Sequence, residues 1–349
     1  MIKWSEDKEG GIESVKSELN QPDGLMVSHV DDLAFAGQEV FHKNFIEKLK
    51  DIFPVGLTES GLEGFKYAGV VVRQNQNLEI RIDQKDYIGS VTEVKIDRGL
   101  EGAKVLGFKQ QAGYRSLLGA IQWIASRSRP DVAYRASRMA SYSGKATAQN
   151  MRDLNKVARN VFGSNNMTIK FRRFNENANL RLLLISDGNL AREKDEKSQG
   201  GFWILLAEDK DSNVEEIKVS ILSWRSWKLK RIAVSSLCAE TQALHVAIDA
   251  VLGVQELIKM MHGVKLEIDC RTDCEALYNA ITKSNATEMQ RTRVQIASIK
   301  EDVENKNLRS VKHICGKTNP ADVFTKDNDK KILAISLKMM HEGLLKDCS

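Results

Sequence analysis

The second half of the chain alternates between short apolar runs and longer segments with helical spacing. An apolar run typical of a buried strand occupies residues 180–186, and further strands are expected at 200–207, 217–227 and 311–315. Alternating apolar and polar positions predict another strand at 266–272. Apolar positions at helical spacing predict helices over residues 235–261, 274–283, 291–305 and 330–341. This order of strands and helices predicts an α/β domain built on a mixed five-stranded sheet with flanking helices.

The first half has shorter elements. Residues 24–36 are two apolar runs around a polar pair, which predicts a β-hairpin with Asp31 and Asp32 at its turn. Helical spacing predicts an amphipathic helix over residues 38–53. The elements expected next are a hairpin at residues 65–73 and 78–83, a helix at 84–94, and a mostly helical stretch at 112–164. Apolar periodicity fades within residues 165–179, where we place a domain boundary.

Composition narrows the class of protein. The chain has 349 residues, of which 42% are hydrophobic and 28% charged, as in an ordinary globular protein of two or three domains. Such a composition excludes a disordered or collagen-like chain. No run of about 18 apolar residues lacks a charge, so we expect no membrane span. The N-terminus has no apolar signal region. The five cysteines are odd in number and widely spaced, which favours reduced thiols in an intracellular protein.

Charge is concentrated locally. The formal net charge is +5, yet residues 102–152 carry nine basic side chains and one acid, Asp131. A positive field of this kind suits phosphate backbones, although from charge alone a solvated basic face is the simpler explanation. In a second cluster tryptophans alternate with cations, a combination that suits base stacking with phosphate contact. This cluster comprises Lys218, Trp224, Arg225, Trp227, Lys228, Lys230 and Arg231.

Four acidic residues lie where a purely structural carboxylate is costly. Asp187 and Asp273 end predicted strands, and Asp322 begins a predicted helix just after the fifth strand. Glu240 shares a helix face with the apolar residues that follow it, so we expect it to point toward the core. Strand ends and a helix start can meet at one edge of a sheet.

Converging carboxylates repel one another and need cations to stay ionised. Hard oxygen ligands favour Mg²⁺ or Mn²⁺, and two such ions about 4 Å apart can activate a water and stabilise the leaving oxygen of a phosphodiester. Plainer interpretations exist for single residues: Asp322 as a charge at a helix start, and Asp187 as a turn residue. Glu240 is the hardest to explain as structure alone.

Short motifs in the second half resemble the ribonuclease H domain of copia-type LTR retrotransposon Pol polyproteins. They are LISD at 184–187, ILSWRS at 221–226, SSLCAE at 235–240, RTD at 271–273 and NPADVFTK at 319–326. The first half resembles the end of the same family's reverse transcriptase. Its motifs are HVDDLAFAG at 29–37, FKYAG at 65–69, YRSLLG at 114–119 and RPDVAY at 129–134. The resemblance covers roughly residues 25–345.

The resemblance implies a fold of the α/β and α+β classes. A truncated reverse transcriptase palm and thumb would precede a ribonuclease H-like mixed five-stranded sheet with flanking helices. The implied domains are residues 1–105 as the C-terminal part of the palm, 106–170 as a helical thumb or connection, and 175–349 as the ribonuclease H-like domain.

The implied activity is metal-dependent hydrolysis of the RNA strand of RNA–DNA hybrids. The family's catalytic, metal-binding carboxylates fall on Asp187, Glu240, Asp273 and Asp322. They would hold two Mg²⁺ ions, with Mn²⁺ as an alternative. We expect nucleic acid to contact Arg115, Arg127, Arg129, Arg135, Trp224, Trp227 and Lys228. Arg127 and Arg129 are the leading phosphate contacts.

The polymerase half lacks part of the family's pattern. Asp31 and Asp32 match the paired aspartates of the polymerase hairpin, but the aspartate of an earlier palm strand has no counterpart. Because that polymerase needs all three carboxylates, we expect no DNA synthesis by this chain alone.

The partners implied are an RNA–DNA hybrid or another nucleic acid and other parts of the Pol polyprotein, with no membrane. The implied location is a cytoplasmic virus-like particle, or the nucleus. Two alternatives stay open. One is a non-catalytic nucleic-acid-binding remnant or co-opted protein, and the other is a fragment of an active reverse transcriptase polyprotein.

Overall fold

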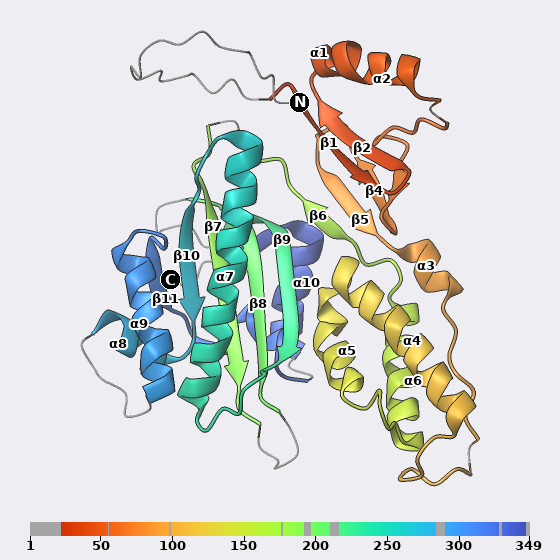
Figure 1. Cartoon of the computed structure of the whole chain (residues 1–349), viewed down its shortest axis with the longest axis vertical. Helices are drawn as coiled ribbons and strands as arrows, with labels where there is room; N and C mark the ends of the chain where they lie inside the picture. The colour runs from red at the N-terminus through yellow and green to blue at the C-terminus, as the bar shows by residue number, and fades with distance from the viewer. Residues whose placement is uncertain are drawn as a thin grey trace, which may run out of the picture.

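A computed structural model gives the fold shown in Figure 1 and describes residues 22–346 except 55, 98, 176, 192–196, 210–215, 284–289 and 328–329. The strands before the middle of the chain are β1 (Gly24–His29), β2 (Asp32–Gly37), β3 (Phe65–Tyr67), β4 (Val70–Gln74), β5 (Ile80–Asp83) and β6 (Ile169–Phe171). Those after it are β7 (Leu180–Asn189), β8 (Gln199–Glu208), β9 (Glu216–Lys228), β10 (Glu267–Thr272), β11 (Ser310–His313) and β12 (Leu344–Lys346).

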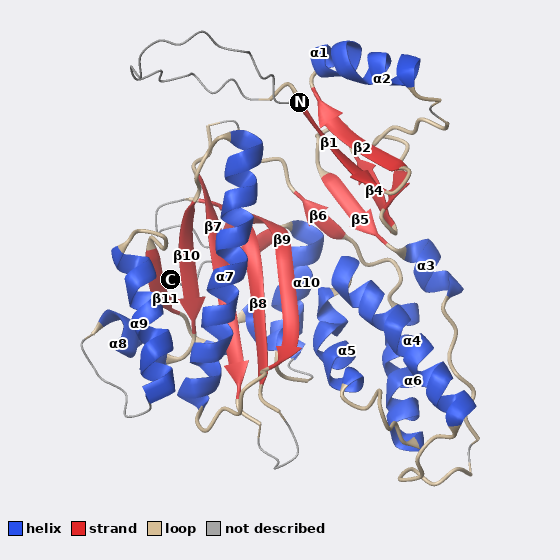
Figure 2. Cartoon of the chain, viewed as in Figure 1, coloured by secondary structure: helices blue, strands red, loops and turns tan. Residues whose placement is uncertain are grey.

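Helices alternate with these strands (Figure 2). In the first half they are α1 (Glu39–Phe41), α2 (Glu47–Ile52), α3 (Lys85–Ser90), α4 (Phe108–Arg127), α5 (Ala133–Ala140) and α6 (Ala148–Gly163). In the second half they are α7 (Ser236–His262), α8 (Glu275–Thr282), α9 (Gln290–Glu304) and α10 (Lys330–Glu342). A π-helical turn, η1 (His42–Ile46), and three 3₁₀ turns, η2 (Pro130–Val132), η3 (Gly316–Thr318) and η4 (Pro320–Phe324), complete the set in the described residues.

The largest sheet is mixed, as the sequence predicts, but has six strands in the order β11-β10-β7-β8-β9-β12. β7, β8 and β9 form an antiparallel meander, while β10 and β11 run parallel to β7. The prediction of five strands is one short. The sixth strand, β12, pairs antiparallel with β9 and has three residues, too few to show an alternating pattern.

Both faces of this sheet are covered, which explains the continuous apolar character of β7. Leu182 and Leu184 pack in a core cluster with α7, α8 and α9, whereas Leu183 and Ile185 pack in another cluster with η4 and α10. Because successive side chains of a strand point to opposite faces, an odd-numbered polar residue farther along β7 faces the η4 side.

The long helix α7 lies along one face of the sheet (Figure 1). It begins where the Ser235 hydroxyl accepts a hydrogen bond from the Cys238 amide, and it ends at Gly263, which is left-handed with φ of 69°. By length and composition alone it is the one helix among the described residues that could cross a membrane. More than half of its most apolar window is buried against the protein, as expected of a core helix.

The first half contains a two-stranded β1-β2 sheet and a four-stranded sheet in the order β3-β4-β5-β6. The strand expected over residues 65–73 is two strands, because Ala68 and Gly69 both have positive φ and form a turn. A Cβ on Gly69 would lie 2.6 Å from the Trp123 ring. The stretch expected to hold the domain boundary contains β6, whose Ile169 is fully buried in the core of the large sheet.

The helices α4, α5 and α6 surround a core of their own that includes Tyr114 and Leu154. This helical part contacts the large sheet through α5, which packs against β9 (Figure 1). Hydrogen bonds join the parts; for example, Trp224 Nε1 donates to the Ala125 carbonyl over 2.9 Å, and Gln199 Nε2 donates to the Ser137 hydroxyl over 3.0 Å. The helices expected at residues 38–53 and 84–94 differ, the first interrupted by η1 and the second ending as α3 at Ser90.

Candidate metal centre

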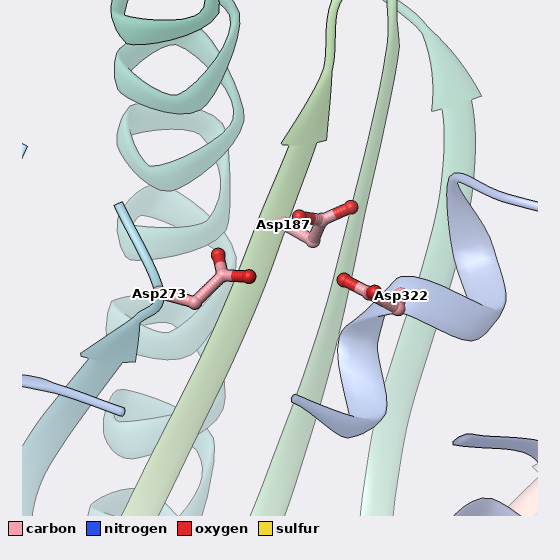
Figure 3. Close-up of side chains that lie close together, drawn as sticks. All are labelled: Asp187, Asp273 and Asp322. Atoms are coloured by element: carbon pink, nitrogen blue, oxygen red, sulfur yellow. The ribbon is translucent and has the colours of Figure 1, made fainter. Parts of the chain in front are cut away.

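Three aspartates from separate elements meet at one end of the large sheet (Figure 3). Asp187 lies in β7, Asp273 directly follows β10, and Asp322 lies in η4. One carboxylate oxygen from each lies within 4.8 Å of the others. We call these three residues the carboxylate cluster. It is the one group in the described part of the chain whose acid, histidine or cysteine ligand atoms are this close together.

Strand register explains how two members of the cluster come together. β7 extends to Asn189, three residues beyond the predicted end, so Asp187 lies within the strand rather than after it. In the parallel pairing of β10 with β7, Arg271 is opposite Ile185. Two residues farther along each strand, Asp273 therefore comes beside Asp187.

Asp322 is brought to the cluster by a short capped turn. The Asn319 side chain accepts a hydrogen bond from the Ala321 amide at the start of η4, and Pro320 occupies the first turn. Asn319 Nδ2 also donates to the Ser186 carbonyl over 3.3 Å, which ties η4 to β7. A Cβ on Gly201 of β8 would lie 2.3 Å from Phe324, so η4 rests directly on the sheet.

Glu240 approaches the cluster from α7 on the opposite side of β7. Its Oε2 accepts a hydrogen bond from the Gly188 amide over 3.0 Å, and the residue is buried. The inward orientation that the helix pattern predicts is therefore observed. Burial, together with the nearby charges of Asp187 and Asp273, raises the pKa of Glu240 well above its usual range. Glu240 is not among the residues whose carboxylate oxygens lie within 4.8 Å of one another.

The cluster concentrates negative charge where solvent has little access, since Asp187 and Asp322 are buried and Asp273 is half-buried. Burial, and then the charge of Asp322, raises the pKa of Asp187 to about 6. Burial likewise raises the pKa of Asp273 and of Asp322. Each of these acids thus ionises less readily than it would alone, as expected of carboxylates that share a poorly solvated site.

Within the part of the chain that the structure describes, the cation paired with these acids is Lys326. Its Nζ is 2.9 Å from Oδ2 of Asp322 and 3.9 Å from Oδ1 of Asp187. The hydroxyl of Thr325 donates a hydrogen bond to Oδ2 of Asp187. Sequence reasoning assigned no role to either residue. The available signal was the spacing of Asp322 and Lys326, four residues apart, which suits an ion pair across one turn.

The cluster fits a hard divalent cation. It offers carboxylate oxygens only, and one ammonium group cannot neutralise three to four acids. Oδ1 of Asp322 is buried and accepts no hydrogen bond from the described residues. A buried carboxylate oxygen without a donor is costly, and a metal ion is a partner that would satisfy it.

The structure corrects one of the expected nucleic-acid contacts. Arg129 is only 2% exposed, and its guanidinium pairs with Asp131 over 2.8 Å. It also donates to the Ser164 carbonyl and hydroxyl, and Ser164 is the residue that caps the C-terminal end of α6. Arg129 therefore holds helices together and is not available to a phosphate. The cluster of basic residues in the sequence could not distinguish this buried arginine from its exposed neighbour Arg127.

The other expected contacts lie at or near the surface. Arg115 and Arg127 are exposed on α4, with Arg127 4.5 Å above the Trp123 ring. Arg135 is half-buried on α5 and its Nε donates to Asp327 over 2.9 Å. Half-buried Trp224, Trp227 and Lys228 line a cavity of about 540 Å³ between β9 and the helices α4 and α5.

Asp31 and Asp32 lie apart from the carboxylate cluster. Asp31 is in the turn between β1 and β2, and Asp32 begins β2, as the hairpin pattern predicts. Both side chains are exposed, and neither belongs to a group of three close ligand atoms among the residues described.

No known protein-family model matches the chain. Among solved structures, LC11-RNase H1, isolated from compost by a metagenomic approach, matches with a TM-score of 0.31 and 16% identity, covering 42% of this chain and 92% of that one. RNase H1 from the halophilic archaeon Halobacterium salinarum matches with a TM-score of 0.30 and 19% identity, covering 42% and 94%.

A foamy viral protease-reverse transcriptase in complex with an RNA/DNA hybrid matches over a longer part of the chain. The TM-score is 0.45 and the identity 14%, with 87% of this chain covered. This chain spans 37% of the length of that viral protein.

Proposed function

We propose that this chain is a copia-type Pol fragment whose large sheet carries a metal-dependent ribonuclease, which hydrolyses the RNA strand of RNA–DNA hybrids. The observation that carries the proposal is the carboxylate cluster, in which three aspartates from separate elements, two of them buried and Asp273 half-buried, meet with Glu240 beside them. Such a concentration of buried negative charge is costly without a cation, and a costly arrangement of this kind points to function.

In this proposal Asp187, Asp273 and Asp322 hold Mg²⁺, or Mn²⁺ in its place, and Glu240 completes the set. The bound metal would supply activation of a water and stabilisation of the leaving oxygen of a phosphodiester. The protein's own contribution is position. The Thr325 hydroxyl orients Asp187, the Gly188 amide holds Glu240, and Lys326 fixes Asp322.

Selectivity for a hybrid would come from its shape. A hybrid shows 2′-hydroxyls on one strand only, in a wide minor groove that protein side chains can contact. Arg115, Arg127 and Arg135 on the helical part would then contact phosphates, with Trp224 and Trp227 near the strand beside them. The assignment of residues 1–170 to the end of a reverse transcriptase rests on their motifs and belongs to the same proposal.

The test is cleavage of a labelled 20-base-pair hybrid by the purified full chain in Mg²⁺. We expect cuts in the RNA strand alone, with the DNA strand, double-stranded DNA and double-stranded RNA left intact. Asp187→Asn keeps the side chain's shape and removes one charge from the cluster, so it should abolish cleavage and leave hybrid binding intact or tighter. Asp249→Asn is the matched control, because Asp249 is exposed on α7.

Two results would contradict the ribonuclease proposal. A wild-type chain that binds the hybrid but does not cut it in Mg²⁺ or Mn²⁺ would be a non-catalytic binding remnant. Cleavage by Asp187→Asn at the wild-type rate would place the chemistry elsewhere.

A further inference from the structure

A second cavity, of about 360 Å³, opens beside the carboxylate cluster where α5 meets the ends of β7, β8 and β9. Tyr134 and Arg138 of α5 line one side, one helical turn apart. Thr325 and Lys326 line the side next to the cluster. We call this the basic cavity. It is built jointly by the helical part and the large sheet.

Its charge is that of an anion site. Arg138, Lys197 and Lys228 are cationic lining residues, and a fourth, Lys326, shares its charge with Asp322 of the cluster, 2.9 Å away. The single acid among them, Asp327, is paired with Arg135 over 2.9 Å. Cations gathered in a concave, partly buried space attract a phosphate more strongly than the same charges spread over an open surface.

The walls of the cavity are held in place. Gln199 Nε2 donates to the hydroxyls of Ser137 on α5 and Ser226 on β9, over 3.0 and 2.8 Å. Asn189 Nδ2 donates to the Thr325 carbonyl over 3.0 Å. These bonds fix α5 and the segment after η4 against the sheet, so the backbone positions from which Arg138 and Lys326 extend are set before a ligand arrives.

Thr325 and Lys326 link the cavity to the cluster. Both line the cavity, and both also contact Asp187, the first through its hydroxyl and the second through its ammonium at 3.9 Å. A phosphate in the cavity would therefore lie a short distance along the same strand, or across the duplex, from the bond at the carboxylate cluster.

We propose that the basic cavity is a phosphate subsite, which binds a backbone phosphate of the nucleic acid held at the carboxylate cluster. This deepens the proposed function and rests on it. The consequence is that the helical part supplies a substrate contact, Arg138, to a site whose acids all come from the large sheet. The helical part and the large sheet would then together determine which phosphodiester bond of the duplex lies at the carboxylate cluster.

The experiment measures binding separately from cleavage. A fluorescein-labelled RNA–DNA hybrid is titrated in EDTA with the full chain carrying Asp187→Asn, alone and combined with Arg138→Gln or Lys228→Gln. We expect each added substitution to weaken binding about 3- to 10-fold at 0.1 M salt, and to reduce the slope of log K against log salt by about 0.9. Lys265→Gln is the control, since it removes the same charge just before β10, at the end away from Asp273.

Arg138→Lys distinguishes an effect of the positive charge on binding from an effect of the guanidinium on folding. It keeps the cation and should restore most of the affinity and the salt slope, whereas a purely structural role of the guanidinium would not be rescued. Should Arg138→Gln lower the melting temperature markedly, Lys228→Gln and Lys197→Gln carry the test, because Lys197 is exposed.

The outcomes distinguish the two proposals. If the wild type cuts hybrid but Arg138→Gln and Lys228→Gln bind like Lys265→Gln, the subsite is wrong and the ribonuclease stands. If the wild type does not cut but these variants lose affinity selectively, the cavity binds phosphate and the ribonuclease proposal fails.

Discussion

The amide of Gly188 donates a hydrogen bond to Oε2 of Glu240 over 3.0 Å, across the contact between β7 and α7. The two backbones can approach this closely because residue 188 has no side chain. A Cβ there would lie 2.6 Å from the Glu240 Cα and from the Ala239 carbonyl. The position of the fourth acid relative to the carboxylate cluster thus depends on a glycine.

Gly188→Ala should therefore displace α7 from the sheet. We expect a loss of about 1–3 kcal/mol in the free energy of unfolding, the usual cost of overpacking a core, and a fall in hybrid cleavage as Glu240 moves. Gly253 lies in α7 and has open space around it, so Gly253→Ala should be neutral or should stabilise the protein by up to about 1 kcal/mol. Urea unfolding of both variants measures this, and equal stability of the two would rule the steric account out.

The elements of the large sheet could be predicted because their pattern is strong. Leu182 to Ile185 are buried on both sides of β7, and a continuous apolar run is what such a strand requires. The inward orientation of Glu240 followed in the same way from the face it shares with apolar helix residues.

Other features depend on contacts between residues that are distant in the sequence, and the pattern of apolar and polar positions does not show such contacts. The length of β7 is set by pairing of Asn189 with Gln199, and the burial of Arg129 by the end of α6. Lys326 acts on a residue that is far away in the sequence, since its partner Asp187 is 139 positions away. Distances of this kind are a property of tertiary packing rather than of local periodicity.

Lys326 should act as a substitute for part of the metal's charge. In Lys326→Met the acids lose their nearest cation, so the metal-free protein should lose up to about 1 kcal/mol of stability at pH 7.5, the range of a half-exposed ion pair. Mg²⁺ should bind several-fold more tightly because a competing positive charge is gone. Calorimetric titration with Mg²⁺ measures this beside Lys265→Met, which should bind as the wild type does. Weaker Mg²⁺ binding in Lys326→Met would show that the lysine supports the metal instead.

Ile169 should make the large sheet depend on the segment that precedes it. Its side chain is fully buried in the core cluster that contains Leu183 and Trp203, although β6 pairs with β5 of the smaller sheet. We expect Ile169→Ala to cost about 2–5 kcal/mol and Ile169→Val about 0.5–1.5 kcal/mol. Thermal unfolding followed by circular dichroism measures the series. A negligible cost for both would mean that residues 175–349 form an independent core.

The carboxylate cluster should also make stability depend on pH in an unusual direction. An acid whose pKa is higher in the folded state binds its proton more tightly there, so it contributes stability at low pH and loses it as pH rises through that pKa. For Asp187 the pKa rises from 3.8 to about 6, which corresponds to about 3 kcal/mol lost between about pH 4 and pH 7 in the absence of metal. Other paired acids such as Asp269 have a lowered pKa and act in the opposite direction, so the total pH profile alone does not isolate the cluster.

The difference between the wild type and Asp187→Asn isolates it. In EDTA the variant should gain stability relative to the wild type as pH rises from 4 to 7, because an uncharged amide replaces an acid that ionises at a cost. Saturating Mg²⁺ should reverse this at pH 7.5, stabilising the wild type and leaving the variant nearly unchanged, since a ligand bound only by the folded state adds stability in proportion to its occupancy. Unfolding free energies at pH 4.5, 6 and 7.5, with EDTA and with Mg²⁺, measure both effects. A difference between the two proteins that does not change with pH in EDTA would mean that Asp187 is ionised throughout this range, and that its charge is already neutralised within the chain.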